Sequence, residues 1–346
     1  MKSNSLSEKD GSLGITTSNV STFNKKSRKW GLLERVKVIM KHTNYKVLSC
    51  QRAIAQVVIE RSGDVARIHG VMSCGSIWLC PVCSQRIAYE RCEMIKQASK
   101  SGFNMFLVTA TLQHKKSDEL KVLLKALKQA LRKLKQGRWW KSFRERFGVE
   151  AYVSSYEINY GFHGWHPHSH ILVFVSKEID IDDFWNRLKV RYVKAIEKVG
   201  QYASSFHGLD VKEADENAGS YLTKWSLGSE MTGQFVKSGQ SFWDLVEMGK
   251  SELCLEYAEA TFGLKSLTWS HHAKDILGIK DFTVEKPKDW STIASVNDGL
   301  WRVIRTQALQ GVCLQLAILD DSGQALNDYL DKLENSGVNK VQNDTK

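Results

Sequence analysis

Three histidines recur at every second position in GWHPHSH, residues 164–170. They are His166, His168 and His170, and a fourth histidine, His163, precedes them. Successive side chains of a β-strand point to opposite faces, so a strand here carries all three imidazoles on one face. Buried imidazole nitrogens each need a partner, which makes such a row harder to reconcile with a plain core. The segment therefore predicts a strand with one chemically specialised face.

The pairing partner of this strand follows from the sequence before it. Strands are predicted at 149–159 and 166–175, joined through the glycine-flanked turn YGFHG. Antiparallel partners lie at equal distances from the turn, and a hairpin centred between Phe162 and His163 places Glu157 opposite His168.

This hairpin predicts a metal site. Two imidazoles and a carboxylate on adjacent strands can hold a divalent cation and leave coordination positions open for a substrate. We assign His168, His170 and Glu157 as ligands. His166 is either a fourth ligand or a hydrogen-bond donor to a ligand, and His163 belongs to the turn.

A cysteine group forms a second candidate site. Cys74, Cys80 and Cys83 have zinc-ligand spacing, and no export signal favours disulfides for the seven cysteines of the chain. A hairpin is predicted from strands 53–60 and 65–72, and centring it on Ser62 places Cys50 opposite Cys74. We predict a structural Zn2+ site with four cysteine ligands, for which Cys92 and His69 are alternative fourth ligands.

The charge distribution indicates a polyanionic partner. The chain of 346 residues has a formal charge of +11, and residues 115–146 alone hold twelve Lys or Arg against three acids. An amphipathic helix over 117–136 has a leucine stripe and a cationic face, which we assign to DNA binding. That face comprises Lys121, Lys125, Lys128, Arg132 and Lys135. Trp139 and Trp140 are candidates either for holding single-stranded DNA or for the core.

A tyrosine supplies the candidate nucleophile. A helix is expected to carry ENAGSYLTKW, residues 216–225, in which Lys224 shares a face with Tyr221 and can lower the pKa of the phenol. Asn217 lies one turn earlier, with Glu216 and Glu213 nearby. A phenolate beside a metal is a plausible nucleophile towards phosphorus.

The expected fold is α+β, with a central antiparallel sheet flanked by helices and an N-terminal zinc-stabilised hairpin unit. We expect a basic, partly disordered arm over 1–45 and a cysteine-rich zinc unit over 46–101. A catalytic core over 102–230 and a mainly helical C-terminal region over 231–346 follow. Hydrophobic content of 42% is ordinary for a globular protein, and the absence of a long apolar run or secretory signal leads us to expect a cytoplasmic protein without membrane contact.

The order of these motifs resembles that of a known family. CGSIWLCPVC, FLVTATLQH, YEINYGFHGWHPHSHILVF and YLTKW follow one another as in the rolling-circle plasmid replication initiators of the HUH endonuclease superfamily. LCLEYAEATFG and LTWSHHAKDILG are similar to the C-terminal part of those initiators. The resemblance covers about residues 46–280.

The resemblance implies a function. It implies that His168 and His170 bind Mg2+ or Mn2+, and that Tyr221, with Lys224, nicks DNA through a 5′-phosphotyrosine intermediate and later rejoins it. It further implies single-stranded or extruded origin DNA as substrate, with host helicase and polymerase as partners. Ser169 stands where the family has a bulky apolar residue. Asn217 stands where some relatives have a glutamate that activates water. Glu216 or Glu213 is a candidate to replace that glutamate.

Two other readings fit the sequence. A relaxase or transposase would use the same strand chemistry on another DNA substrate. A non-catalytic, zinc-stabilised DNA-binding protein would explain the charge and the cysteines and treat the histidines as structural.

Overall fold

The computed structural model describes residues 17–205, 207–215, 239–280 and 289–343. Within these ranges, side chains are described from residue 28 to residue 336. The candidate nucleophile segment, Tyr221 with Glu216, Asn217 and Lys224, lies outside these residues. In the described part, no helix is both long and apolar enough to cross a membrane.

A five-stranded antiparallel sheet forms the centre of the molecule, in the order β6-β3-β5-β4-β7. Its long middle strands are β4 and β5, and the outer strands are shorter. The strands are β3 (Asn104–Thr111), β4 (Val149–Gly161), β5 (Gly164–Val175), β6 (Leu209–Ala214) and β7 (Leu267–Trp269). The predicted strands 149–159 and 166–175 and the turn between them are therefore confirmed.

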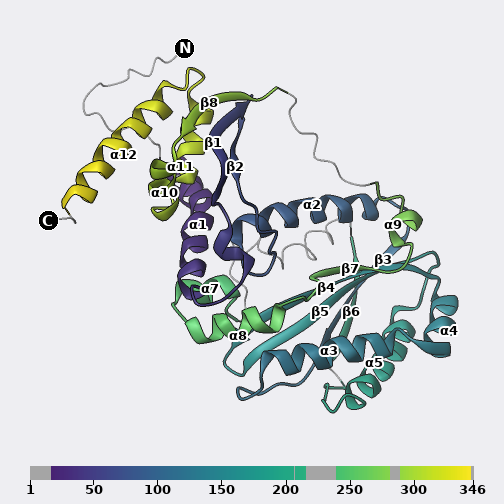
Figure 1. Ribbon diagram of the computed structural model, residues 1–346. Coiled ribbons are helices and arrows are strands. Elements are labelled where there is room, and N and C mark those ends of the chain that lie inside the picture. Colours follow the sequence, from purple (N-terminus) through teal and green to yellow (C-terminus); the bar gives the residue numbers. More distant parts are fainter. Residues whose placement is uncertain (1–16, 206, 216–238, 281–288, 344–346) are drawn as a thin grey trace.

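Helices cover both faces of this sheet, as Figure 1 shows. On one face lie α3 (Leu120–Leu134), α5 (Ile181–Glu197) and α8 (Ser251–Thr261), which bury the alternate apolar residues of β3 and β5. The other face is covered at one end by α2 (Pro81–Ser99) and α9 (Ala273–Ile276) around Leu172 and Phe174. The end of that face beyond Leu172 carries polar side chains, and it is there that the histidines lie.

A smaller sheet has the order β2-β1-β8 and joins distant parts of the chain. The hairpin β1 (Ala53–Ser62) and β2 (Val65–Val71) is extended by β8 (Ser291–Val296). Three C-terminal helices share its core, and Figure 1 shows them beside the hairpin. They are α10 (Asp298–Thr306), α11 (Gln310–Leu319) and α12 (Gln324–Asn343). The α+β class and the antiparallel sheets agree with the sequence.

The expected division of the chain differs from this arrangement. The described residues after 238 pack in two places: α7 (Phe242–Glu247), α8, β7 and α9 pack on the central sheet, whereas β8 and α10–α12 pack on the hairpin. The expected arm over 1–45 contains a helix that its polar composition did not predict, α1 (Thr17–Ile39). Leu33 and Val36 of α1 are completely buried, because they lie on the face turned towards the core.

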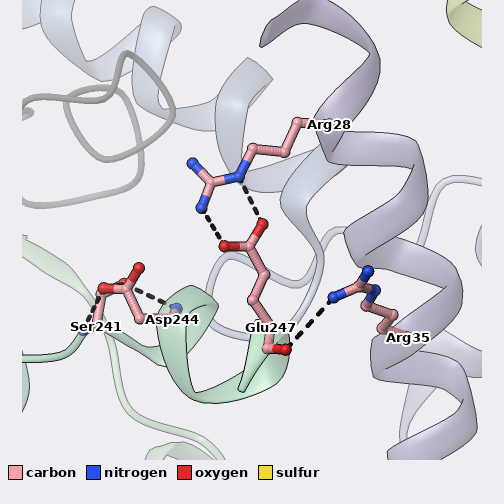
Figure 2. Close-up of polar contacts among 5 residues, drawn as sticks. All are labelled: Arg28, Arg35, Ser241, Asp244 and Glu247. Carbon is pink, nitrogen blue, oxygen red and sulfur yellow. Dashed lines mark hydrogen bonds and ion pairs between the residues drawn. The ribbon is translucent and has the colours of Figure 1, made fainter. Parts of the chain in front are cut away.

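The first helix is fastened to the short helix α7. The guanidinium of Arg28 donates two hydrogen bonds to the carboxylate of Glu247, at 2.7 and 2.6 Å, and Arg35 donates one to the Glu247 carbonyl at 3.4 Å (Figure 2). At the other end of α7, Ser241 and Asp244 form a capping box. The contacts with Arg28 and Arg35 join the N-terminal helix to the first helix described after the candidate nucleophile segment.

Candidate metal centre

The β4–β5 hairpin brings the predicted ligands together in the predicted register. Glu157 pairs with His168, and Ser155 pairs with His170. Both histidines and Glu157 lie on the same face of the sheet, because paired residues and residues two apart along a strand share a face. Glu157 is 7% exposed and His170 is 2% exposed, so the site is largely shielded from water.

The donor atoms of these three residues have the spacing of metal ligands. Glu157 Oε2 lies 3.1 Å from His168 Nε2 and 3.3 Å from His170 Nε2, and one atom of each residue falls within 4.8 Å of the other two. Two ligands about 2.1 Å from a cation and at right angles are about 3.0 Å apart. A small divalent cation therefore fits the two imidazoles and the carboxylate without rearrangement of the backbone.

Protonation also favours metal binding. Burial alone would raise the pKa of Glu157, but hydrogen bonds from His168 and His170 outweigh it and lower this pKa to about 2. Burial lowers the pKa of His170 below its usual value, although the contact with Glu157 opposes this. The carboxylate is thus ionised and the His170 imidazole neutral near pH 7, which is the state that a metal ligand must have.

Two neighbouring residues that the sequence analysis did not identify hold the ligands in place. Asn159 donates a hydrogen bond of 2.8 Å to Glu157 Oε1, which leaves Oε2 turned towards the histidines. Thr109 Oγ1 lies 3.1 Å from His170 Nδ1, a contact that orients the ring and directs Nε2 to the site. Periodicity could have identified Asn159, which is two residues from Glu157 on the same strand, whereas Thr109 is placed only by the pairing of β3 with β5.

His166 does not join the three-residue group. Its Nε2 lies 3.1 Å from Thr111 Oγ1, and its ring stacks on His114 with 4.5 Å between centroids. Its ring also contacts that of His168, with centroids 4.3 Å apart. His166 thus lies beside the ligands, and its hydrogen-bond partner is Thr111 and not one of the three. His163 lies in the exposed turn, as expected.

Of the residues proposed to activate water, only Glu213 is described. It pairs with Phe106, whereas Asp210 pairs with Thr109, so Glu213 lies on the opposite face from the histidines. Glu213 is therefore wrong as a substitute for the missing glutamate. The described chain resumes at residue 239, where Gln240 pairs with Tyr160 near the end of the β4–β5 hairpin.

The four predicted cysteines converge at the start of α2. Cys50 Sγ lies 3.5 Å from Cys80 Sγ and 3.7 Å from Cys83 Sγ, and Cys74 Sγ lies 3.7 Å from Cys83 Sγ. Four sulfurs about 2.3 Å from a tetrahedral zinc ion are about 3.8 Å apart. Cys50 is the fourth member, and the alternatives Cys92 and His69 lie outside this group.

The hairpin register explains how Cys50 reaches Cys74. Ala53 pairs with Val71, in line with the expected centre at Ser62, but a register shift follows and Val58 pairs with His69. The extra residues of β1 bulge where Gly70, with φ of +82°, lets the Gln56 carbonyl approach closely. The expected register is thus correct beside the cysteines and wrong towards the turn, which lies at Gly63 and Asp64.

The predicted cationic face of α3 is mostly exposed. Lys125, Lys128 and Arg132 face solvent, and Lys121 does so while it forms an ion pair of 2.7 Å with Glu259 of α8. Lys135 is half-buried, with its ammonium 4.5 Å from the centre of the Tyr152 ring.

The two tryptophans of α4 (Gly137–Phe147) are half-buried. Trp139 and Trp140 stack on Phe143, with centroid distances of 5.0 and 5.5 Å. Much of the surface of the two tryptophans therefore packs in the core, which was one of the two roles expected for them.

Comparison with known proteins gives matches in this region. Residues 65–205 match the family described as Rep_1, replication protein. The chain is 24% identical to "Protein rep" of Streptomyces lividans, over 64% of this chain and 67% of that protein. It is 30% identical to "Neomycin resistance protein" of Streptomyces cyanogenus, over 35% of each. No solved structure matches.

The family match includes the whole β4–β5 hairpin with Glu157, His168 and His170, and three of the four clustered cysteines. These matches confirm the resemblance suggested by the motifs: residues 65–205 match the replication-protein family, and the chain is similar to a protein named rep.

Proposed function

We propose that this protein initiates rolling-circle replication of a plasmid by nicking one DNA strand at the origin and later rejoining it. The observation that carries the proposal is the group of Glu157, His168 and His170, whose donor atoms lie within 4.8 Å of one another on adjacent strands. Two imidazoles and one carboxylate leave coordination positions for a phosphate oxygen, as a Lewis-acid site requires.

Glu157, His168 and His170 would hold Mg2+ or Mn2+. When bound, the cation supplies positive charge that polarises a scissile phosphate. Asn159 and Thr109 orient the ligands, and burial of the ligands keeps competing water away from them.

Tyr221 is the proposed nucleophile, on the strength of the YLTKW motif alone. Its phenolic oxygen forms a bond to phosphorus while the bond from phosphorus to the 3′ oxygen breaks and that oxygen takes a proton. The products are a 5′-phosphotyrosine link and a free 3′-OH, from which a host polymerase can extend with a host helicase opening the duplex. Attack by a new 3′-OH reverses the step and rejoins the strand. Lys224 would stabilise the phenolate, and Asn217 and Glu216 complete the proposed catalytic segment.

Zn2+ is the proposed occupant of the four-cysteine group. Its place between the hairpin and the first turn of α2 suits a structural role, because the site fastens two elements and lies apart from the histidines. The exposed cations Lys121, Lys125, Lys128 and Arg132 are proposed to contact DNA phosphates. Lys135 contributes less, because burial destabilises the charge of its ammonium.

A denaturing gel tests the proposal. Purified protein is mixed with Mn2+ and single-stranded oligonucleotides that tile the replicon and are labelled at the 3′ end. We expect a protein-linked labelled product that disappears in Tyr221→Phe and in His168→Ala. DNA binding without an adduct on any tile, while a nicking relative is active in parallel, would favour the non-catalytic DNA-binding protein instead. Cleavage confined to transfer-origin or transposon-end sequences would favour a relaxase or transposase.

A further inference from the structure

A cationic groove lies between α4 and α5, on the face of the central sheet opposite the histidines. Two adjoining cavities, of about 290 and 420 Å3, share Arg191 and Lys194 in their walls. The first also contains Lys133 and the N-terminus of α4 at Gly137, and the second contains Trp139 and Arg187. We refer to the two cavities together as the α4–α5 groove.

The cations of this groove form a row along α5. Arg187, Arg191, Lys194 and Lys198 follow one another at intervals of four, three and four residues. Such spacing places side chains on one face of a helix. At about 1.5 Å per residue the row is about 16 Å long, enough for several successive phosphates of one strand.

Little negative charge opposes this row. Asp183 is the single acid among the described lining residues, and it already pairs with Arg146 at 2.8 Å and with Arg187 at 2.7 Å. Among the residues that the structure describes, Lys133, Arg191, Lys194 and Lys198 form no ion pair. Their charge therefore remains available to an anion from outside.

The chemistry of the groove fits a polynucleotide backbone. The helix α4 begins at Gly137 beside Lys133, and its N-cap residue Gln136 makes no side-chain hydrogen bond to the first amides of the helix. The Arg191 guanidinium lies 5.4 Å from the centre of the Trp139 ring. Cations that line a narrow groove next to an aromatic ring are typical of binding to single-stranded nucleic acid.

We propose that the α4–α5 groove binds the phosphate backbone of single-stranded DNA, without sequence preference. The inference rests on the DNA-handling role proposed above. Because α5 covers the sheet face opposite Glu157 and His168, the groove would hold DNA away from the scissile phosphate.

The salt dependence of binding tests this inference. Fluorescence anisotropy of a labelled, mixed-sequence single strand gives the Kd of the full chain over a range of KCl concentrations, without divalent metal. The variant carries Arg191→Gln, Lys194→Gln and Lys198→Gln. Its matched control removes the same charge from exposed positions elsewhere, through Lys100→Gln, Arg302→Gln and Lys332→Gln.

We expect the groove variant to bind at least about 10-fold more weakly at low salt, with the slope of log K against log salt reduced by about 2, since each lost phosphate contact removes about 0.7. The control should keep the native slope. An unchanged slope, an equal loss in both variants, or a loss confined to duplex DNA would overturn the inference. If the triple variant fails to fold, Lys194→Gln with Lys198→Gln should reduce the slope by about 1.4.

The failure of this inference can be distinguished from failure of the nicking proposal. The binding assay contains no divalent metal and requires no cleavage. A native protein that never forms an adduct but whose DNA binding depends on the groove would contradict the nicking proposal alone.

Discussion

Lys135 offers a quantitative test of the electrostatics of this fold. Its side chain turns inwards at the end of α3, with the ammonium 4.5 Å from the centre of the Tyr152 ring. Burial lowers the pKa of this lysine from 10.5 to about 8. Charge on this side chain is therefore less stable in the folded protein than in the unfolded chain, and we expect Lys135→Met to stabilise the protein at neutral pH.

The magnitude follows from the two pKa values. At about 1.4 kcal/mol per pKa unit, a difference between about 8 and 10.5 corresponds to about 3 kcal/mol at pH 7. Attraction between the ammonium and the Tyr152 ring is lost in the variant and offsets about 1 kcal/mol of this. We expect the free energy of unfolding to rise by about 2 kcal/mol at pH 7.

The dependence on pH has a definite sign. Between pH 8 and 10.5 the unfolded chain binds more protons at Lys135 than the folded protein does, so native stability rises with pH in this range. Lys135→Met removes that rise, and its advantage should shrink to about 1 kcal/mol or less by pH 10.

Urea unfolding of both proteins at pH 7 and pH 10 measures the effect, with Lys128→Met as a control at an exposed position of the same helix. A variant that is less stable at pH 7, or an advantage that does not change with pH, would refute the assignment of a buried, destabilised ammonium. The same substitution should change DNA affinity less than Lys128→Met does.

Three further substitutions have defined outcomes. Gly70→Ala should lower the free energy of unfolding by about 2–4 kcal/mol, measured by urea unfolding, because the residue has φ of +82° and an added methyl would meet the Gln56 carbonyl; an unchanged midpoint would show that the bulge can relax. Glu247→Gln should cost about 1 kcal/mol, because it weakens the paired hydrogen bonds to Arg28 in Figure 2; the loss should vanish when Arg28 is already replaced by Met, and a loss that persists would contradict the pairing. Thr109→Val should weaken Mn2+ binding about 10- to 100-fold in titration calorimetry, because His170 loses the partner of Nδ1; native affinity in this variant would show that the contact does not orient the ring.

The histidine strand could be predicted because its information is local. Alternation along residues 164–170 fixes the face, and the turn fixes the register that sets Glu157 opposite His168. Thr109 could not be assigned in the same way. Its role depends on the pairing of β3 with β5, which lie side by side in the sheet although β4 separates them in the chain.

Contacts between elements far apart in the chain had no local signal either. β8 pairs with β1, which lies more than two hundred residues earlier in the chain. The apolar residues of α10–α12 predict that these helices are buried, but not which surface they pack against. The cysteine site was predicted in part. Spacing identified Cys74, Cys80 and Cys83, and the expected hairpin pairing identified Cys50. The bulge of β1 was not predicted, because no local pattern indicated it.

Peptide mapping of the DNA–protein adduct tests the central claim most directly. The native protein reacts with its cleavable single strand in Mn2+, the DNA is digested to a nucleotide remnant, and mass spectrometry locates the modified residue. The account predicts a 5′-phosphate remnant on Tyr221, formed by the native protein and absent when Glu157 is replaced by Gln. A remnant on another residue, or an adduct that forms undiminished in Glu157→Gln, would contradict it.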